Sequence, residues 1–281
     1  MGERILTNEY IEKFASYLQN EEKSCNTQEK YIRDVHAFFQ TVGNGVVTKE
    51  VVIEYKMGLI SRDYAIRSIN SMLASLNCLF KFLGWDDLQV KSIKIQQQTF
   101  CPKEKELTKQ EYLRLVNAAG SRGNERLNLL LQPICGTGIR VSELPYITVE
   151  AAKSGEAKVL LKGKNRIVFI VNDLRKKLLK YAKRQRITTG PIFITGGGKI
   201  MSRSNIWREM KKLCVFANVN PQKVFPHNLR HLFARAFYNV KKDIAKLADV
   251  LGHSSINTTR IYIVTTGDEH RRCMENLKLI I

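Results

Sequence analysis

A polar stretch near the middle of the chain, residues 94–106, constrains the fold more than any other feature of the sequence. It reads KIQQQTFCPKEKE, contains a proline and lacks the apolar repeat of a helix or a strand. Such a segment is typical of a linker between domains. Because 281 residues are many for one hydrophobic core and enough for two, we predict a domain over 1–98, a linker over 99–106 and a second domain over 107–281.

The net charge of the chain is +20, and all of the excess lies after the first domain. Residues 1–98 hold 12 basic and 12 acidic side chains, whereas residues 99–281 hold 34 basic and 14 acidic ones. An excess of this size on one domain favours a polyanionic partner such as DNA. For single clusters, such as the basic side chains of 175–184, a solvated surface is the ordinary explanation.

The first domain is expected to be a small helical bundle, because apolar residues recur at helical spacing through most of it. Its predicted helices cover 7–20 after a capping Thr7, begin after Thr27 and end near 43–45, begin at Thr48, and cover 65–83.

The second domain is expected to be mostly helical with one β-hairpin. Residues 157–161 and 166–170 are short β-type runs that are joined by Lys162-Gly-Lys-Asn165. Thr108 and Glu111 form a capping-box pattern that begins a helix. Further helices are predicted over 126–134, 173–186 and 204–217 and after Pro226, so the fold class is mainly α with a small β-sheet (α+β).

Side chains suited to phosphate chemistry lie close together towards the end of the chain. His227 and Arg230 are three residues apart, which places both on one helical face. The next helical pattern stops at Gly252, a residue that suits a helix C-cap; His253 lies just beyond it, and Tyr262 follows nine residues later. A guanidinium matches two phosphate oxygens, an imidazole moves protons near neutrality, and a tyrosine hydroxyl can attack phosphorus. The pattern indicates phosphoryl transfer to tyrosine.

Each of these residues alone has an ordinary explanation as packing or as solvated surface. Their order and spacing give them weight, together with an arginine far upstream, Arg140, in the stretch GTGIRVSEL. With this stretch, HNLRHLFA and LGHSSINTT, the chain resembles the tyrosine recombinases, or phage-type integrases, of the Xer and mobile-element type. The resemblance covers nearly the whole length.

The resemblance implies a helical, SAM-like core-binding domain followed by a catalytic domain that cleaves and rejoins DNA through a 3′-phosphotyrosyl intermediate. The family's catalytic positions fall on Arg140, Lys162, His227, Arg230, His253 and Tyr262. Lys162 is favoured for the lysine, and Lys164 is the alternative.

The resemblance also implies a role for each residue. The two arginines stabilise the non-bridging oxygens, Lys162 protonates the leaving oxygen and Tyr262 is the nucleophile. His227 is the general acid or base towards Tyr262, and His253 donates a hydrogen bond to the phosphate. The tail, about 264–281, is expected to dock on a neighbouring subunit and to link four protomers on double-stranded DNA.

No cofactor or metal is expected. Gly196-Gly-Gly-Lys199 lacks the glycine spacing of a P-loop, and no carboxylates are spaced to hold two metals. No run of about 18 apolar residues, no signal-peptide core and no C-x-x-C pair is present in the sequence, so we expect a cytoplasmic, nucleoid-associated protein with no membrane segment. Two alternatives stay open: a type IB topoisomerase-like nicking and closing enzyme, and a non-catalytic DNA-binding regulator.

Overall fold

Two large hydrophobic cores organise the chain. The computed structural model describes residues 3–43, 45–94, 103–161, 164–262 and 274–277. The chain divides into the units Met1–Gln97 and Gln98–Ile281, each built around one of these cores. Of the linker predicted over 99–106, residues 99–102 lie outside the described part, and Lys103–Lys105 form the short 3₁₀ helix η2.

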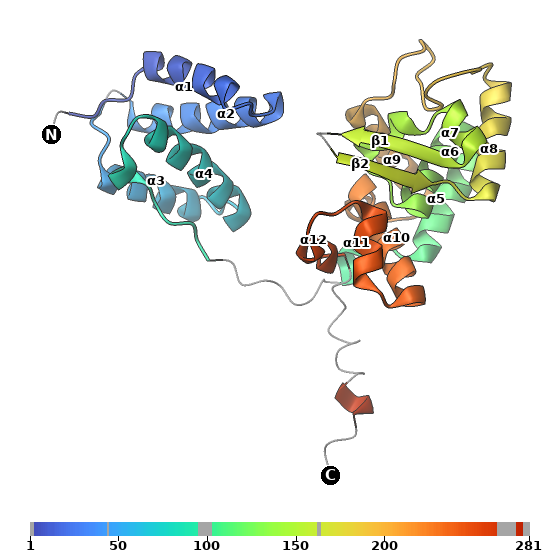
Figure 1. The fold of residues 1–281 in the computed structure, drawn as a ribbon. Helices are drawn as coiled ribbons and strands as arrows, with labels where there is room; N and C mark the ends of the chain where they lie inside the picture. Colours follow the sequence, from blue (N-terminus) through green and yellow to red (C-terminus); the bar gives the residue numbers. More distant parts are fainter. Residues whose placement is uncertain (1–2, 44, 95–102, 162–163, 263–273, 278–281) are drawn as a thin grey trace. The chain divides into compact units, whose positions relative to one another are not determined.

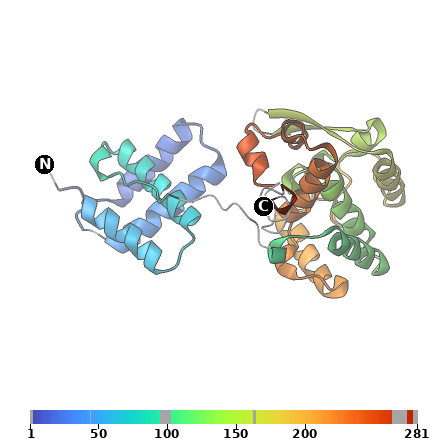
Figure 2. The ribbon, with the colours of Figure 1, turned by 90° about the horizontal axis from the view of Figure 1, so that it is seen from below.

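The N-terminal unit is a bundle of helices, as predicted (Figures 1 and 2). Thr7 and Thr48 cap their helices as expected, each accepting a hydrogen bond from the backbone three residues on. The second helix begins earlier than predicted, because Ser24 rather than Thr27 is its N-cap and the two hydroxyls pair at 2.8 Å. The helices are α1 (Asn8–Asn20), α2 (Cys25–Val42), α3 (Lys49–Ser61), α4 (Ile66–Phe82) and the 3₁₀ helix η1 (Asp86–Leu88).

One buried carboxylate ties α2 to α4 inside this bundle. The Asp34 side chain is buried, and its Oδ2 accepts hydrogen bonds from Lys30 Nζ at 2.6 Å and from Ser75 Oγ at 2.8 Å. Lys30 also donates to the Ser71 carbonyl at 3.0 Å. A buried charge is tolerated when it is paired and hydrogen-bonded in this way, so this network favours one register between the two helices.

The C-terminal unit is built around α6, which contacts α5, α8 and α10. Leu127, Leu130, Leu131 and Ile134 are all buried, so α6 is covered on most sides. The elements of the unit are α5 (Lys109–Ser121), α6 (Glu125–Thr137), η3 (Val141–Tyr146), α7 (Val149–Ser154), β1 (Glu156–Leu161), β2 (Lys164–Phe169), α8 (Asn172–Arg184), α9 (Arg203–Ala217), η4 (Pro221–Lys223), α10 (Pro226–Lys241), α11 (Ile244–Leu251) and α12 (Ile256–Arg260). The predicted fold class, mainly α with a small sheet, is confirmed.

The predicted capping box and hairpin are both present. The Thr108 hydroxyl accepts from the Glu111 backbone N–H at 3.1 Å, and the Glu111 carboxylate accepts from the Thr108 N–H at 2.8 Å. The strands β1 and β2 are antiparallel: Glu156 pairs with Phe169 at one end of the ladder, and Leu161 pairs with Lys164 at the other. The connection is therefore shorter than the predicted turn over 162–165, because Lys164 and Asn165 still take part in the ladder.

The last helices and the residues that directly follow them contain four of the six predicted site residues, His227, Arg230, His253 and Tyr262 (orange to red in Figure 1). Helix α10 begins at Pro226, and α11 ends at Gly252, which adopts the left-handed conformation of a C-cap with φ +63°. Both were predicted. The tail expected over about 264–281 lies mostly outside the described residues. Within its described part, residues 274–276 form a helical turn.

Candidate active site

The centre of the site is Arg230, a charged side chain that is only 1% exposed. Its Nη1 donates to the Gly138 carbonyl, and its Nη2 donates to the Leu251 carbonyl at 2.7 Å and lies 3.0 Å from Nε2 of His253. Its Nε is buried without a hydrogen-bond partner among the described residues. Burial, followed by the nearby Arg140 guanidinium, lowers the pKa of Arg230 to about 10.

A glycine turn makes this arrangement possible. Gly138 ends α6 in the left-handed region, with φ +66°, and presents its carbonyl to Arg230. A Cβ atom at this position would lie 2.5 Å from a ring carbon of Phe233 on α10. Only glycine fits both the conformation and the close approach of the two helices.

The next turn places Arg140 beside a buried carboxylate. The Arg140 backbone N–H donates to Glu143 Oε2 at 2.9 Å, and its Nη1 donates to Oε1 at 2.9 Å. Glu143 thus holds Arg140 in place from one turn further on. Burial alone would raise the pKa of Glu143, but the Arg140 backbone N–H and Arg166 outweigh it and keep this pKa below its ordinary value. The Arg140 side chain stays 34% exposed, so part of its guanidinium faces solvent.

His253 connects Arg230 to the last helix. A guanidinium can only donate hydrogen bonds, so Nε2 of His253 must be the acceptor towards Arg230. The proton of the neutral ring is then on Nδ1, which donates to Thr259 Oγ1 at 2.9 Å. Burial, followed by Arg230, lowers the pKa of His253 to about 4, in agreement with this neutral form.

The phenol ring of Tyr262 is buried against these groups. Its centroid lies 5.2 Å from that of the His253 ring and 5.8 Å from the guanidinium carbon of Arg230. The Tyr262 backbone N–H donates to the Thr259 carbonyl at 2.9 Å, and this bond ties the backbone of Tyr262 to the end of α12. The structure thus brings Tyr262, Arg230 and His253 into contact.

The other predicted site residues are placed less completely. His227 is exposed on the first turn of α10, and burial of part of the ring, followed by Arg230 and Arg140, lowers its pKa. It therefore lies within electrostatic reach of both arginines. Lys162 lies outside the described residues; the backbone of Lys164 belongs to β2, and its side chain is likewise outside.

Sequence reasoning missed Arg166. Its Nη2 donates to Glu143 Oε2, and its Nη1 donates to the Val250 carbonyl at 2.7 Å, which ties β2 to α11. Strand alternation contained the signal: Arg166 shares a face with Val168 and pairs with Val159, both buried, so an inward-pointing charge was indicated.

His231 was missed as well. Its ring stacks on Tyr262, with centroids 4.2 Å apart and planes at 24°. Burial, followed by Arg235, lowers its pKa to about 4. It directly follows Arg230 in the helix, and adjacent helical residues point in different directions, so spacing rules gave no signal for it.

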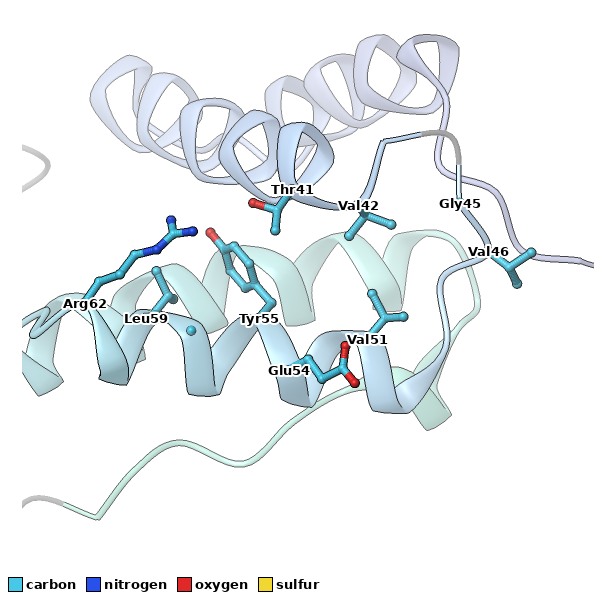
Figure 3. Close-up of a pocket in the computed structure, with 10 residues that line it drawn as sticks. Thr41, Val42, Gly45, Val46, Val51, Glu54, Tyr55, Leu59 and Arg62 are labelled. Carbon is cyan, nitrogen blue, oxygen red and sulfur yellow. The ribbon is translucent and has the colours of Figure 1, made fainter.

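No other part of the described structure offers a comparable site. A pocket of about 340 Å³ lies between the end of α2 and α3 (Figure 3). Its lining is mixed, with apolar side chains beside Thr41, Glu54, Tyr55 and Arg62. Burial raises the pKa of the Tyr55 hydroxyl to about 12, which makes it a poor nucleophile. Among the described residues no three His, Cys, Asp or Glu side chains are grouped to hold a metal, and none of the helices is long and apolar enough to span a bilayer.

Comparison with known families covers both units. Residues 105–268 match the Phage integrase family, and residues 11–87 match the Phage integrase, N-terminal SAM-like domain. Tyrosine recombinase XerA of Pyrococcus horikoshii is 30% identical over 287 residues, which cover 99% of this chain and 96% of the relative. Tyrosine recombinase XerD of Vibrio cholerae is 28% identical over 225 residues, which cover 74% of each chain.

Solved structures agree in fold. A crystal structure of XerA recombinase superposes with a TM-score of 0.55 at 25% identity and covers 98% of this chain and 100% of its own. A lambda integrase dimer bound to a COC′ core site gives a TM-score of 0.73 at 17% identity, covering 92% of this chain and 78% of its own. The chain belongs to the phage integrase family, and the resemblance to tyrosine recombinases is confirmed.

We expect Gly138→Ala to destabilise the C-terminal unit and to disturb Arg230. The matched control is Gly123→Ala, because Gly123 also has a positive φ, +69°, but has open space around the added methyl. The control should lose about 1–2 kcal/mol of unfolding free energy from backbone strain alone, and Gly138→Ala should lose more because Phe233 must move. Urea denaturation measures both; equal losses would contradict the close-packing explanation.

Acid should destabilise the C-terminal unit before its carboxylates titrate. His231 and His253 have pKa values of about 4 in the folded chain, against an ordinary value of 6.5. Between these values the unfolded chain binds more protons, so the histidine contribution to stability is complete above pH 6.5 and is lost as the pH falls towards 4.

Urea denaturation at pH 7.5, 6 and 5 checks this expectation. His231→Phe should weaken the pH dependence, whereas His36→Phe, at an exposed position of α2, should leave it unchanged. An unfolding free energy that stays constant from pH 7.5 to 5 would show that the two rings are not held neutral.

Proposed function

We propose that this chain is a site-specific DNA recombinase in which Tyr262 attacks a backbone phosphodiester and forms a 3′-phosphotyrosyl bond. The attack frees a 5′-hydroxyl, which later attacks the phosphotyrosine of a partner strand and restores the phosphodiester. The observation that carries the proposal is the position of the Tyr262 ring beside the buried Arg230 guanidinium, with Arg140 close by. A nucleophile and its phosphate-binding cations thus share one site.

The charges of the site suit a phosphate. Arg140, Arg166 and Arg230 bring three positive charges, and the only carboxylate that the described structure places among them is Glu143. The Nε atoms of Arg166 and Arg230 are buried without partners, and an unpaired buried donor costs about 1–3 kcal/mol. A bound phosphodiester adds the missing negative charge, and fixed cations stabilise the additional charge of the transition state.

The remaining roles follow from the same chemistry. His227, whose pKa is lowered by burial and then by Arg230 and Arg140, accepts the Tyr262 proton, and Lys162 protonates the leaving 5′-oxygen. His253 donates to the phosphate only after Nε2 gains a proton or the tautomer changes, because Nε2 accepts from Arg230 in the protein without DNA.

We further propose that both units hold the DNA. Residues 1–98 form the core-binding domain, residues 107–281 form the catalytic domain, and most of the counterion release comes from the second, where the net positive charge lies. The tail over 264–281 docks on a neighbouring subunit, so four protomers assemble on two duplexes in the cytoplasm, at the nucleoid. Deletion of the tail is the direct test of the assembly role.

Tyr262→Phe should abolish covalent attachment and leave DNA binding nearly unchanged, because only the nucleophilic oxygen is removed. The measurement is a nicked suicide substrate that traps the covalent adduct on a denaturing gel. Tyr238→Phe is the control, because Tyr238 packs in the same small cluster of α10, α11 and α12. An adduct that persists in Tyr262→Phe would remove Tyr262 from the mechanism.

Assays on a pair of DNA duplexes and on one supercoiled duplex distinguish recombination from the two alternative activities. Recombinant joints between two DNA duplexes identify strand exchange, relaxation of one supercoiled duplex without joints identifies a topoisomerase-like activity, and binding without any adduct identifies a regulator.

Arg140 or Arg230 replaced by Ala should slow cleavage about 100-fold or more, which is the usual effect of losing one preorganised electrostatic donor. Lys should restore little at either position, since it keeps the charge but not the forked guanidinium. At position 230 it cannot reach the carbonyls of Gly138 and Leu251 together, as Arg230 does. Single-turnover cleavage at saturating DNA measures the effect, with the exposed Arg208→Ala on α9 as the control. Near-normal rates with Lys at both positions would contradict the phosphate-clamp role.

A further inference from the structure

The nucleophile has a neighbour that its proposed chemistry does not use. Among the described residues, the ring of His231 makes the closest and most nearly parallel aromatic contact of Tyr262, 4.2 Å between centroids at 24°, against 5.2 Å and 39° for His253. Among the described residues His231 makes no side-chain hydrogen bond, although both of its ring nitrogens can form one. Its interaction with Tyr262 therefore goes through the flat face of the ring.

The two rings come from elements of very different rigidity. His231 lies on α10, a helix of 16 residues that is anchored in the core by Leu229 and Arg230. Tyr262 follows α12, a helix of five residues, and so short a helix is not stable without tertiary contacts. A tyrosine ring rotates about two side-chain bonds, so its orientation has to be set by the surfaces beside it.

We propose that His231 is a positioning residue for the nucleophile: its ring face on α10 sets the orientation of the Tyr262 phenol beside Arg230. This inference rests on the proposed role of Tyr262 as nucleophile. The contact is a stack of two aromatic rings. Burial, followed by Arg235, lowers the pKa of His231 to about 4, so the imidazole is uncharged near neutrality. A neutral, flat and fixed side chain is suited to such a surface.

Positioning by a ring face and proton transfer by a ring nitrogen predict different effects of substitution. His231→Phe keeps the flat face and removes both nitrogens, whereas His231→Leu removes the nitrogens and the flat face at similar size. If the face is what matters, Phe should cleave within about twofold of the wild-type rate. Leu should be slower by about 3- to 10-fold, the rate equivalent of one aromatic pair.

The experiment is single-turnover cleavage of a nicked suicide substrate at saturating DNA, with binding measured separately by gel shift. All variants should bind DNA like the wild type, because His231 contacts the nucleophile and no proposed phosphate ligand is removed. His36→Leu is the control for the loss of an exposed imidazole elsewhere in the chain. Equal slowing in Phe and Leu would overturn the proposal in favour of a nitrogen role, and a wild-type rate in Leu would overturn it altogether.

A second readout does not depend on cleavage. With 3-fluorotyrosine at position 262 of the full chain, the ¹⁹F resonance reports the ring current of a stacked neighbour in the absence of DNA. The shift should be retained in His231→Phe and move towards the free-tyrosine value in His231→Leu; an identical shift in both would show that the face is not in contact. An adduct that survives Tyr262→Phe would instead refute the proposed function, so the two failures are distinguishable.

Discussion

The buried guanidinium of Arg230 is the interaction on which the geometry of the site depends. A charge that is 1% exposed needs compensation from the protein, and here it comes from the carbonyls of Gly138 and Leu251. Gly138 caps α6 and Leu251 is the last residue of α11, so the negative ends of two helices converge on one cation. The fold thereby uses two helix C-termini, whose carbonyls would otherwise lack partners, to hold one buried arginine.

Glu143 compensates the charge of the other two arginines of the site, Arg140 and Arg166. Its two oxygens accept from Arg140 and from Arg166, which reaches it from β2, so one carboxylate orders a turn and a strand together. One negative charge does not neutralise three arginines, and the positive potential that remains helps to hold His227, His231 and His253 in their neutral forms. This excess of positive charge destabilises the protein without DNA, but it forms a preorganised environment that suits a phosphate.

Much of this could be predicted from the sequence, for identifiable reasons. Helix periodicity, the Thr caps, the capping box at Thr108 and the glycine after α11 act locally, and they placed most elements within a few residues. The motif order indicated Arg230, His253 and Tyr262, which the fold brings together. Strand alternation indicated only that Arg166 points inward. The contacts of Arg166 and His231 depend on how β2 and the residues after α12 pack against α11 and α10, and sequence spacing does not contain this tertiary geometry.

His253 shows how Arg230 and Tyr262 are held in one arrangement. It accepts from Arg230 through Nε2 and donates through Nδ1 to Thr259, whose carbonyl in turn receives the backbone N–H of Tyr262. Both contacts can exist together only in the neutral ring with its proton on Nδ1. A second proton on Nε2 would set two donors against each other and release Arg230 from the imidazole. Burial, followed by Arg230, lowers the pKa of His253, and the same Arg230 needs the uncharged ring as an acceptor.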